Sequence, residues 1–259
     1  MVLLRTLVLG AHRRAPARPA LALCLATAWL AAAGQPPEST AGPRPDPTGA
    51  AEPAAAAALE PGQLTPADVL SEEVLTRLEV QIEFVELVKQ SRFEDALPLA
   101  EQMITLTETE FGSPSAELAT ALSNLAIVQR NLRDYEASKD TFLLAIDMYR
   151  EIEGPFSESI ISPLIALGAN YHATGDYTQA LGLFQEARTV NRRSYGLLNP
   201  DQVDIVYHIA ATLASMQQYE EAQLQQEDAL RLMERVYGAD TMEVLPYLYQ
   251  YAAWLVTTF

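Results

Sequence analysis

The chain has 259 residues, enough for one domain of ordinary size or slightly more, and 49% of them are hydrophobic, so a sizeable core can form. It carries 34 acidic residues against 17 lysines and arginines, which gives a formal net charge of -17. This charge excludes nucleic acid as a partner, because nucleic-acid binding needs clustered lysine and arginine. A neutral or basic protein or peptide is the partner that the charge favours.

The first 34 residues predict an export signal. They contain four arginines and no acidic residue, and residues 20–33 form an uncharged apolar run. The run is shorter than the roughly 20 residues that span a bilayer, and Ala31 and Ala33 form a small-residue cleavage site. We therefore expect a signal peptide over residues 1–34 and an exported protein, periplasmic or secreted. The alternatives are an uncleaved membrane anchor, lipidation at Cys24 and an organelle transit peptide.

Residues 35–65 predict a disordered linker. The segment is rich in proline, alanine and glycine. Its prolines interrupt helix formation, and it has few large apolar side chains to bury. We expect it to act as a flexible tether between the signal-like segment and the rest of the chain.

Two kinds of residue recur every 42 positions from about residue 66 onward, which indicates an internal repeat. The recurring aromatic residues are Phe93, Tyr135, Tyr177 and Tyr219. The recurring glycines are Gly112, Gly154, Gly196 and Gly238. Because two residue classes keep one period through three intervals, a structural unit of that length is predicted.

The residues on either side of each aromatic predict two helices per unit. Small residues occupy most positions three and ten residues after it, on one helix face, and a mostly apolar stripe lies nine, ten and thirteen residues before it. A polar turn separates the two stripes, so each unit is predicted to be an antiparallel helix pair. The recurring glycine is expected to be an αL cap after the second helix. Ser162-Pro163 and Asn199-Pro200 are expected to open the next helices as N-cap and N1 pairs.

This unit resembles the tetratricopeptide repeat. The family's positions are matched most clearly by Leu167, Gly168, Tyr171, Gly175, Tyr177, Ala180, Phe184 and Ala187. The 42-residue period exceeds the roughly 34 residues of the common repeat, and residues 195–204 resemble the extended linker of kinesin light chain repeats. The resemblance implies an all-α fold, a right-handed α-solenoid of antiparallel helix pairs over residues 66–259, with about four repeats and an incomplete fifth.

The last unit consists of a first helix only. Residues 247–259 match that helix, with Leu248, Ala252 and Leu255 on its stripe. A natural terminal helix, a truncated reading frame and a helix buried in an oligomer are three readings of this pattern. Since solenoid ends normally carry a polar cap, the third reading predicts self-association through the C-terminal helix.

The resemblance also implies that the first helices line a concave face that holds peptides. Its lining positions lie 15, 11, 5 and 4 residues before each aromatic. The candidate peptide-binding residues there are Thr120, Asn124, Arg130, Asn131, Ser162, His172, Asp204 and His208. Only Asn124 matches the family's asparagine clamp for a peptide backbone. Arg130 is the one cation in this set, so a ligand held by its C-terminal carboxylate is not expected.

The sequence predicts neither an enzyme nor a metal or cofactor site. Cys24 is the only cysteine, so thiolate metal ligation is excluded. His172 and His208 lie 36 residues apart and could be neighbours across units, but two histidines without a placed carboxylate do not predict a metal site. A Gly-x-Ser-x-Gly elbow and a phosphate-binding glycine loop are both absent from the sequence.

The sequence therefore predicts a scaffold of the cell envelope that binds a protein or peptide on the concave face of a repeat array. Membrane contact is expected only through an uncleaved N-terminal segment. The alternative is that the repeats form the docking or regulatory part of a longer protein whose catalytic part is absent from this chain.

Overall fold

The computed structural model describes residues 71–258, so the predicted signal segment (1–34) and linker (35–65) lie outside the described residues. Nine α-helices and no strand occur in this described range. The helices are α3 (Glu72–Lys89), α4 (Phe93–Phe111), α5 (Ala116–Asn131), α6 (Tyr135–Glu153), α7 (Ile161–Ala173), α8 (Tyr177–Tyr195), α9 (Gln202–Ser215), α10 (Tyr219–Tyr237) and α11 (Leu245–Thr258). Short 3₁₀ turns, η1 (Glu158–Ile160) and η2 (Met242–Val244), precede α7 and α11. None of these helices is both long and apolar enough to cross a membrane.

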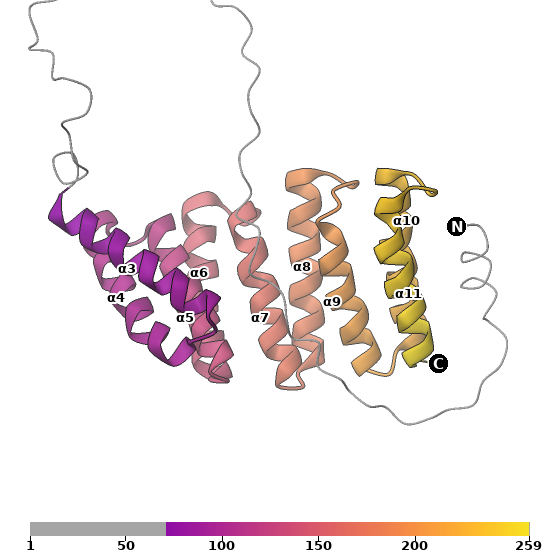
Figure 1. Ribbon diagram of the computed structural model, residues 1–259, viewed down its shortest axis with the longest axis horizontal. Coiled ribbons are helices and arrows are strands. Elements are labelled where there is room, and N and C mark those ends of the chain that lie inside the picture. Colours follow the sequence, from indigo (N-terminus) through magenta and orange to yellow (C-terminus); the bar gives the residue numbers. More distant parts are fainter. Residues whose placement is uncertain (1–70, 259) are drawn as a thin grey trace, which may run out of the picture.

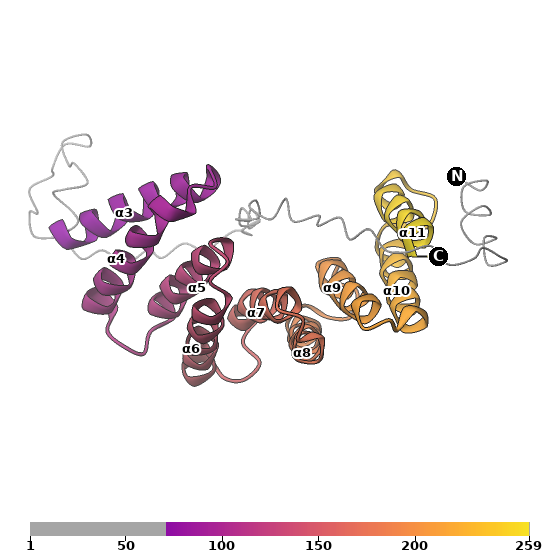
Figure 2. The ribbon, with the colours of Figure 1, turned by 90° about the horizontal axis from the view of Figure 1, so that it is seen from below.

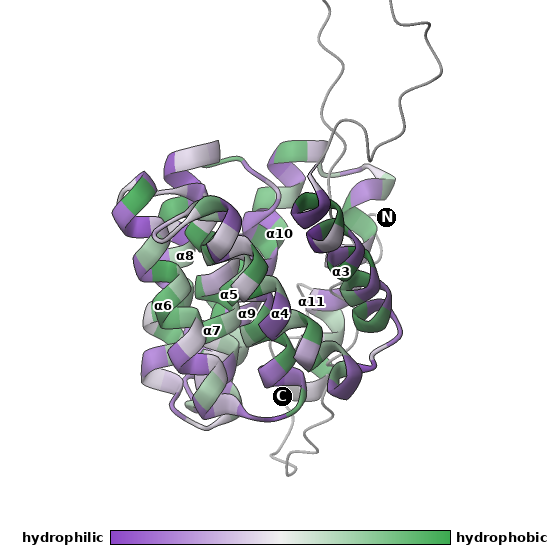
Figure 3. Ribbon diagram, turned by 90° about the vertical axis from the view of Figure 1, so that its left-hand side faces the viewer, coloured by the Kyte–Doolittle hydropathy of each residue, from purple (hydrophilic) through white to green (hydrophobic). Residues whose placement is uncertain are grey.

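The helices pack in chain order as antiparallel pairs, and each pair contacts the next one. Figure 1 shows the pairs side by side along the long axis of the molecule. Figure 2 shows that the array is curved, with α3, α5, α7 and α9 on the inner side and α4, α6, α8 and α10 on the outer side. We call these the inner and outer helices. Each carries both hydrophobic and hydrophilic residues (Figure 3), as amphipathic helices do. The predicted α-solenoid of antiparallel helix pairs is confirmed.

The 42-residue period sets the bounds of the outer helices. Each of the four has 19 residues, begins at the recurring aromatic and ends one residue before the recurring glycine. Asp134 and Asp176 cap two of them, since a carboxylate oxygen of each accepts a hydrogen bond from the backbone N–H three residues later, at 3.2 Å. The starts and ends of these helices are therefore fixed by a few residues in each unit.

Small residues let neighbouring helices approach closely. The residues three positions after each aromatic are fully buried, and they are Ala96, Ser138, Ala180 and Ala222. Ser138 also links two units, because its hydroxyl donates to the Ala126 carbonyl at 2.6 Å and accepts from the Asn170 side chain at 2.7 Å. Four positions further on, the buried rings of Phe142 and Phe184 fill the space between helices in the two central units. The predicted stripe of the second helix is confirmed.

The recurring glycines differ from the αL cap that the sequence predicted. Their φ angles are positive, from 77° to 94°, but in three of the four ψ lies between 169° and -174°, and in Gly238 it is 139°. This backbone region is almost restricted to glycine. The αL residues lie instead in the turn inside each pair, at Ser91, Arg133, Gly175 and Gln217. There the chain closes a Schellman motif, in which for example the Asp176 N–H donates to the Tyr171 carbonyl at 2.9 Å.

The two predicted N-cap pairs are also wrong in register. Helix α7 begins at Ile161, directly after η1, so Ser162 and Pro163 lie inside its first turn. Ile160, the last residue of η1, is buried, and the chain is already helical there, before it reaches Ser162 and Pro163. Helix α9 begins at Gln202, and Asn199 instead accepts a hydrogen bond from the Asp201 N–H at 3.2 Å in the preceding turn.

Helix α11 packs on α10 through part of its apolar surface. Leu248 and Tyr251 are buried, and Trp254 packs against the core. Tyr249 and Val256 are 59% and 84% exposed. The helix therefore carries apolar side chains on an exposed face, and self-association through it stays a prediction.

Replacing Gly168 by alanine should destabilise the array. A Cβ at this position of α7 would lie 2.7 Å from Cε1 of Phe184, and that ring is buried and stacked on His208. We expect the free energy of unfolding to fall by about 1–2 kcal/mol, because overpacking outweighs the better helix propensity of alanine. Urea denaturation followed by circular dichroism measures this change.

Gly182 provides the matched control. It lies in α8, is exposed, and a Cβ there would meet no other atom within 4 Å. Gly182→Ala should therefore raise the free energy of unfolding by up to about 1 kcal/mol. Equal effects of the two substitutions would contradict the packing explanation.

Candidate binding surface

The inner helices present four rows of residues along the concave side of the array (Figure 2). The rows lie 15, 11, 8 and 4 residues before each recurring aromatic, a spacing that keeps them on one helix face. The first and second helices contribute Leu78, Ile82, Val85, Lys89, Thr120, Asn124, Ile127 and Asn131. The third and fourth contribute Ser162, Ala166, Ala169, Ala173, Asp204, His208, Ala211 and Ser215. We call these residues the concave face.

The concave face carries little charge although the chain is strongly acidic. Asp204 is its only acidic residue and Lys89 its only lysine. Helix α7 contains no acidic residue at all. Acidic residues are frequent outside these rows: α10 carries Glu220, Glu221, Glu227, Asp228 and Glu234, and α3 carries Glu72, Glu73, Glu79, Glu83 and Glu86. The four rows of the concave face are therefore a nearly neutral surface of mostly small and apolar residues within a negatively charged molecule.

Two of the predicted residues are available for contact on this face, and two are already engaged. Asn124 is half-buried and Ser162 is exposed, and neither side chain makes a hydrogen bond within residues 71–258. Asn131 is exposed, but its amide donates to the Ile127 carbonyl at 2.7 Å. The Thr120 hydroxyl bonds to the Ala116 carbonyl at 2.9 Å and to the Tyr149 hydroxyl at 2.7 Å. Asn124 thus keeps an amide that can bond to a peptide backbone.

The predicted residue Arg130 is half-buried near the end of α5. Burial lowers the pKa of its guanidinium, and the neighbouring Tyr135 acts in the opposite direction. It makes no ion pair and no hydrogen bond within the described part of the chain. A half-buried guanidinium without an acceptor is unusual, because its desolvation is uncompensated.

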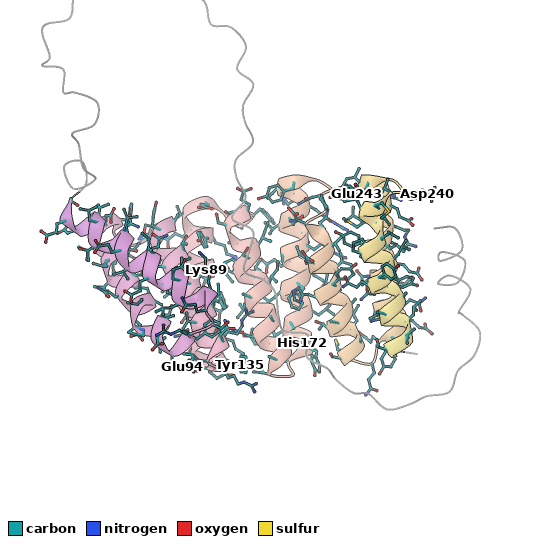
Figure 4. The ribbon with its side chains drawn as sticks, in the orientation of Figure 1. Lys89, Glu94, Tyr135, His172, Asp240 and Glu243 are labelled. Carbon is teal, nitrogen blue, oxygen red and sulfur yellow. The ribbon has the colours of Figure 1, made fainter. Side chains whose placement is uncertain are left out.

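The two predicted histidines come close together on neighbouring inner helices. His172 lies near the end of α7 (Figure 4), and its Nε2 is 3.1 Å from the Ser215 hydroxyl of α9. The His208 ring stacks on Phe184, with ring centroids 4.9 Å apart and an interplanar angle of 11°. Burial lowers the pKa of both rings, and the charges of His172 and Arg130 lower the pKa of His208 further.

Asp204 is half-buried one helical turn before His208. Burial raises the pKa of its carboxyl, and the nearby Asp201 raises it further. It forms no ion pair in the described range. Asp204 lies in the first turn of α9, in the row 15 residues before the aromatic.

Several residues of this surface were missed by the sequence prediction. The row eight residues before each aromatic consists of Val85, Ile127, Ala169 and Ala211. This row lies between the rows 11 and 4 residues before the aromatic, so helical periodicity alone could have predicted it. The stacking of Phe184 on His208 and the position of Lys139, whose Nζ lies 4.8 Å from the Tyr171 ring centroid, depend on packing between units. No sequence signal reports those contacts.

Within residues 71–258, no group of three His, Cys, Asp or Glu side chains could hold a metal ion.

A model of the tetratricopeptide repeat family matches residues 117–193 and 159–235, which run from α5 into α10. The three helix pairs from α5 to α10 are therefore similar to tetratricopeptide repeats. Such arrays are typically scaffolds that bind proteins on extended surfaces. The match covers the three units that carry the candidate residues.

Relatives and solved structures agree with this assignment. Clustered mitochondria protein homologs of Aspergillus niger and Coccidioides immitis are each 23% identical to the chain, over 198 and 188 residues. Each match covers 73% of this chain but only 16% and 14% of those longer relatives.

Two crystal structures share the fold. BtubC (BKLC) from P. vanneervenii has a TM-score of 0.59 at 18% identity, covering 65% of this chain and 67% of that one. A putative kinesin light chain from Podosopora anserina with nearly identical TPR-like repeats has a TM-score of 0.60 at 13% identity, covering 73% and 95%. The predicted likeness to kinesin light chain repeats is confirmed at the level of the fold.

The two histidines should make the array less stable in mild acid. Their lowered pKa values mean that the unfolded chain binds protons more readily than the folded one, so stability falls as the pH drops below about 6.5. His208→Phe keeps a ring on Phe184 and removes one of these groups. Between about pH 7.5 and pH 5.5, we expect the free energy of unfolding of His208→Phe to fall less than that of the wild type. Urea denaturation measures this difference.

Asp204 has the opposite effect, because its raised pKa favours the folded state as the pH falls. The wild-type pH dependence of stability combines both effects. The contribution of a histidine is therefore found by comparing the pH dependence of its variant with that of the wild type. Identical pH dependence of His208→Phe, His172→Gln and the wild type would contradict the assignment.

Proposed function

We propose that the array binds an extended, mainly uncharged segment of another protein along its concave face. The observation that supports this proposal most strongly is that most of this face is uncharged, in a chain whose net charge is -17. A neutral inner surface avoids the desolvation of charged groups that a bound peptide would otherwise impose. The acidic outer surface repels acidic proteins and favours a partner that is neutral or basic as a whole.

Small side chains support an extended ligand. Ala166, Ala169, Ala173 and Ala211 leave the backbone of α7 and α9 accessible along the central part of the face. Asn124 adds an amide that can donate to and accept from a peptide backbone. Ile82, which is 65% exposed, and Val85 offer apolar contacts at the α3 end. The face thus combines apolar contact with a few polar groups, as peptide-binding surfaces commonly do.

Selection from a library of random linear peptides, with the full chain as bait, tests this proposal. Fluorescence anisotropy then measures the affinity of the selected peptides. Ala211→Trp should weaken binding about tenfold or more, because Ala211 is exposed at the centre of the face. Asn124→Ala should weaken it less, by the loss of about one hydrogen bond, near 1 kcal/mol.

The matched control places the same bulk on the outer side. Leu144 is 53% exposed on α6, so Leu144→Trp should leave the affinity unchanged. Equal losses for Ala211→Trp and Leu144→Trp, or no loss for either, would show that peptides bind elsewhere.

Export and a cell-envelope setting are a further part of this proposal. They are supported by the arginine-rich, acid-free start and the apolar run in residues 1–34. The second candidate function is a docking part of a longer protein. It is supported by the much greater length of the two relatives, of which this chain matches 16% and 14%.

Intact mass and peptide mapping of the protein from its native cell separate these candidates. Export with signal cleavage predicts a mature chain that begins at Gly34 or Gln35. A retained Met1 would contradict cleavage and favour an anchor or a cytosolic protein. Peptides that continue past Phe259 would support the docking part of a longer protein.

A further inference from the structure

Three nitrogen-bearing side chains from successive inner helices come close to one another on the inner side of the array. Arg130 lies on α5, His172 on α7 and His208 on α9. Arg130 and His172 occupy the same place in their repeats, five residues before the aromatic. Helix α5 contacts α7, and α7 contacts α9. Both Arg130 and His172 are close enough to His208 for their charges to act on it.

Arg130 is exceptional among the buried cations of the described residues. Arg77 and Arg150 pair with Glu110 and Glu186, each at 2.6 Å. Arg188 and Arg192 donate to glutamine side chains. Arg133 and Arg235 also lack an ion pair within residues 71–258, but both are exposed to solvent. Arg130 alone combines partial burial with the lack of any acceptor, so an anion beside it would compensate its desolvation.

No carboxylate of residues 71–258 forms an ion pair with Arg130, His172 or His208. Tyr135 of α6 lies beside Arg130, and the Ala211 carbonyl and Ser215 hydroxyl of α9 lie beside His172. Phe184 of α8 lies beneath His208. Lys139 of α6, paired with Glu136 at 2.8 Å, lies over Tyr171. Asp204 precedes His208 by one turn and forms no ion pair with it.

We propose that Arg130, His172 and His208 together bind the side-chain carboxylate of an acidic residue in a peptide lying along the concave face. This inference rests on the proposed function and adds the chemistry of one position of the ligand. A guanidinium can donate two parallel hydrogen bonds to a carboxylate, and imidazole N–H groups can donate the others. One acidic residue in an otherwise uncharged segment would fix which residues of the peptide lie against which inner helix.

A side-chain carboxylate suits this place better than a free C-terminus. Uncharged residues surround the cluster, with Ile82 and Asn124 toward α3 and Ala211 and Ser215 of α9 beside His172. A peptide can therefore continue from the cluster toward α3 along uncharged residues. Binding of a carboxylate would also favour the protonated histidines, so the affinity should rise as the pH falls toward 6.

Four synthetic peptides of about eleven residues, built from alanine, leucine and serine, test the proposal. Three carry acetyl and amide caps with glutamate, glutamine or lysine at the centre, and the fourth has central glutamine and a free C-terminus. Anisotropy with the full chain should show the glutamate peptide binding about tenfold tighter than the glutamine peptide near pH 6. The ratio should shrink near pH 8, as the histidines lose their charge.

Arg130→Gln and Arg133→Gln form the matched pair of variants. Arg130→Gln should abolish the preference for glutamate, so that the glutamate and glutamine peptides bind this variant equally. Arg133 is an exposed cation in the next turn, so Arg133→Gln should keep the preference. Thermal denaturation verifies that both variants fold.

Each remaining outcome contradicts a different statement. Equal binding of the glutamate and glutamine peptides overturns the carboxylate site and leaves the proposed function intact. A preference for the peptide with the free C-terminus assigns the site to a terminal carboxylate instead and overturns the side-chain assignment. No binding of any peptide up to about 1 mM overturns the proposed function together with this inference.

Discussion

Close approach of neighbouring helices at small side chains is the constraint on which the rest of the structure depends. Ala96, Ser138, Ala180 and Ala222 occupy one register position in four units and are fully buried. Because these small side chains are buried between the helices, each outer helix packs closely against its inner helix. The rings of Phe142 and Phe184 fill the remaining space in the central units. Repetition of this contact every 42 residues produces a regular curved array.

This register also separates charge between the two sides of the molecule. The inner helices α5, α7 and α9 place mostly small and uncharged residues on the concave face, whereas the outer helices α4, α6 and α10 carry five acidic side chains each. Charge on the outer side favours solubility, and the inner side is left free to bind an uncharged chain. The cluster of Arg130, His172 and His208 lies on three successive inner helices, α5, α7 and α9. It would fix the register of a bound segment.

Periodicity made the helix pairs predictable, because the aromatic and glycine positions repeat without an insertion. Helix starts were less predictable: the Ser162-Pro163 signal was overridden by burial of Ile160, which extends the helical path by an additional turn. The eight candidate residues follow from register alone, and the structure places Asn124, Arg130 and both histidines on the inner side. Their grouping was not predictable, since it depends on the packing of α5, α7 and α9 against one another and on the stacking of His208 on Phe184.

Mapping a bound peptide on the isotope-labelled protein by NMR tests the central claim most directly, that the concave face is the binding surface. Backbone amide shifts would be recorded while a selected peptide is added to the full chain. The account predicts that the largest changes lie on α5, α7 and α9, around Asn124, Ala169 and Ala211. Changes concentrated on α6, α8 and α10, or on the exposed apolar residues of α11, would contradict it.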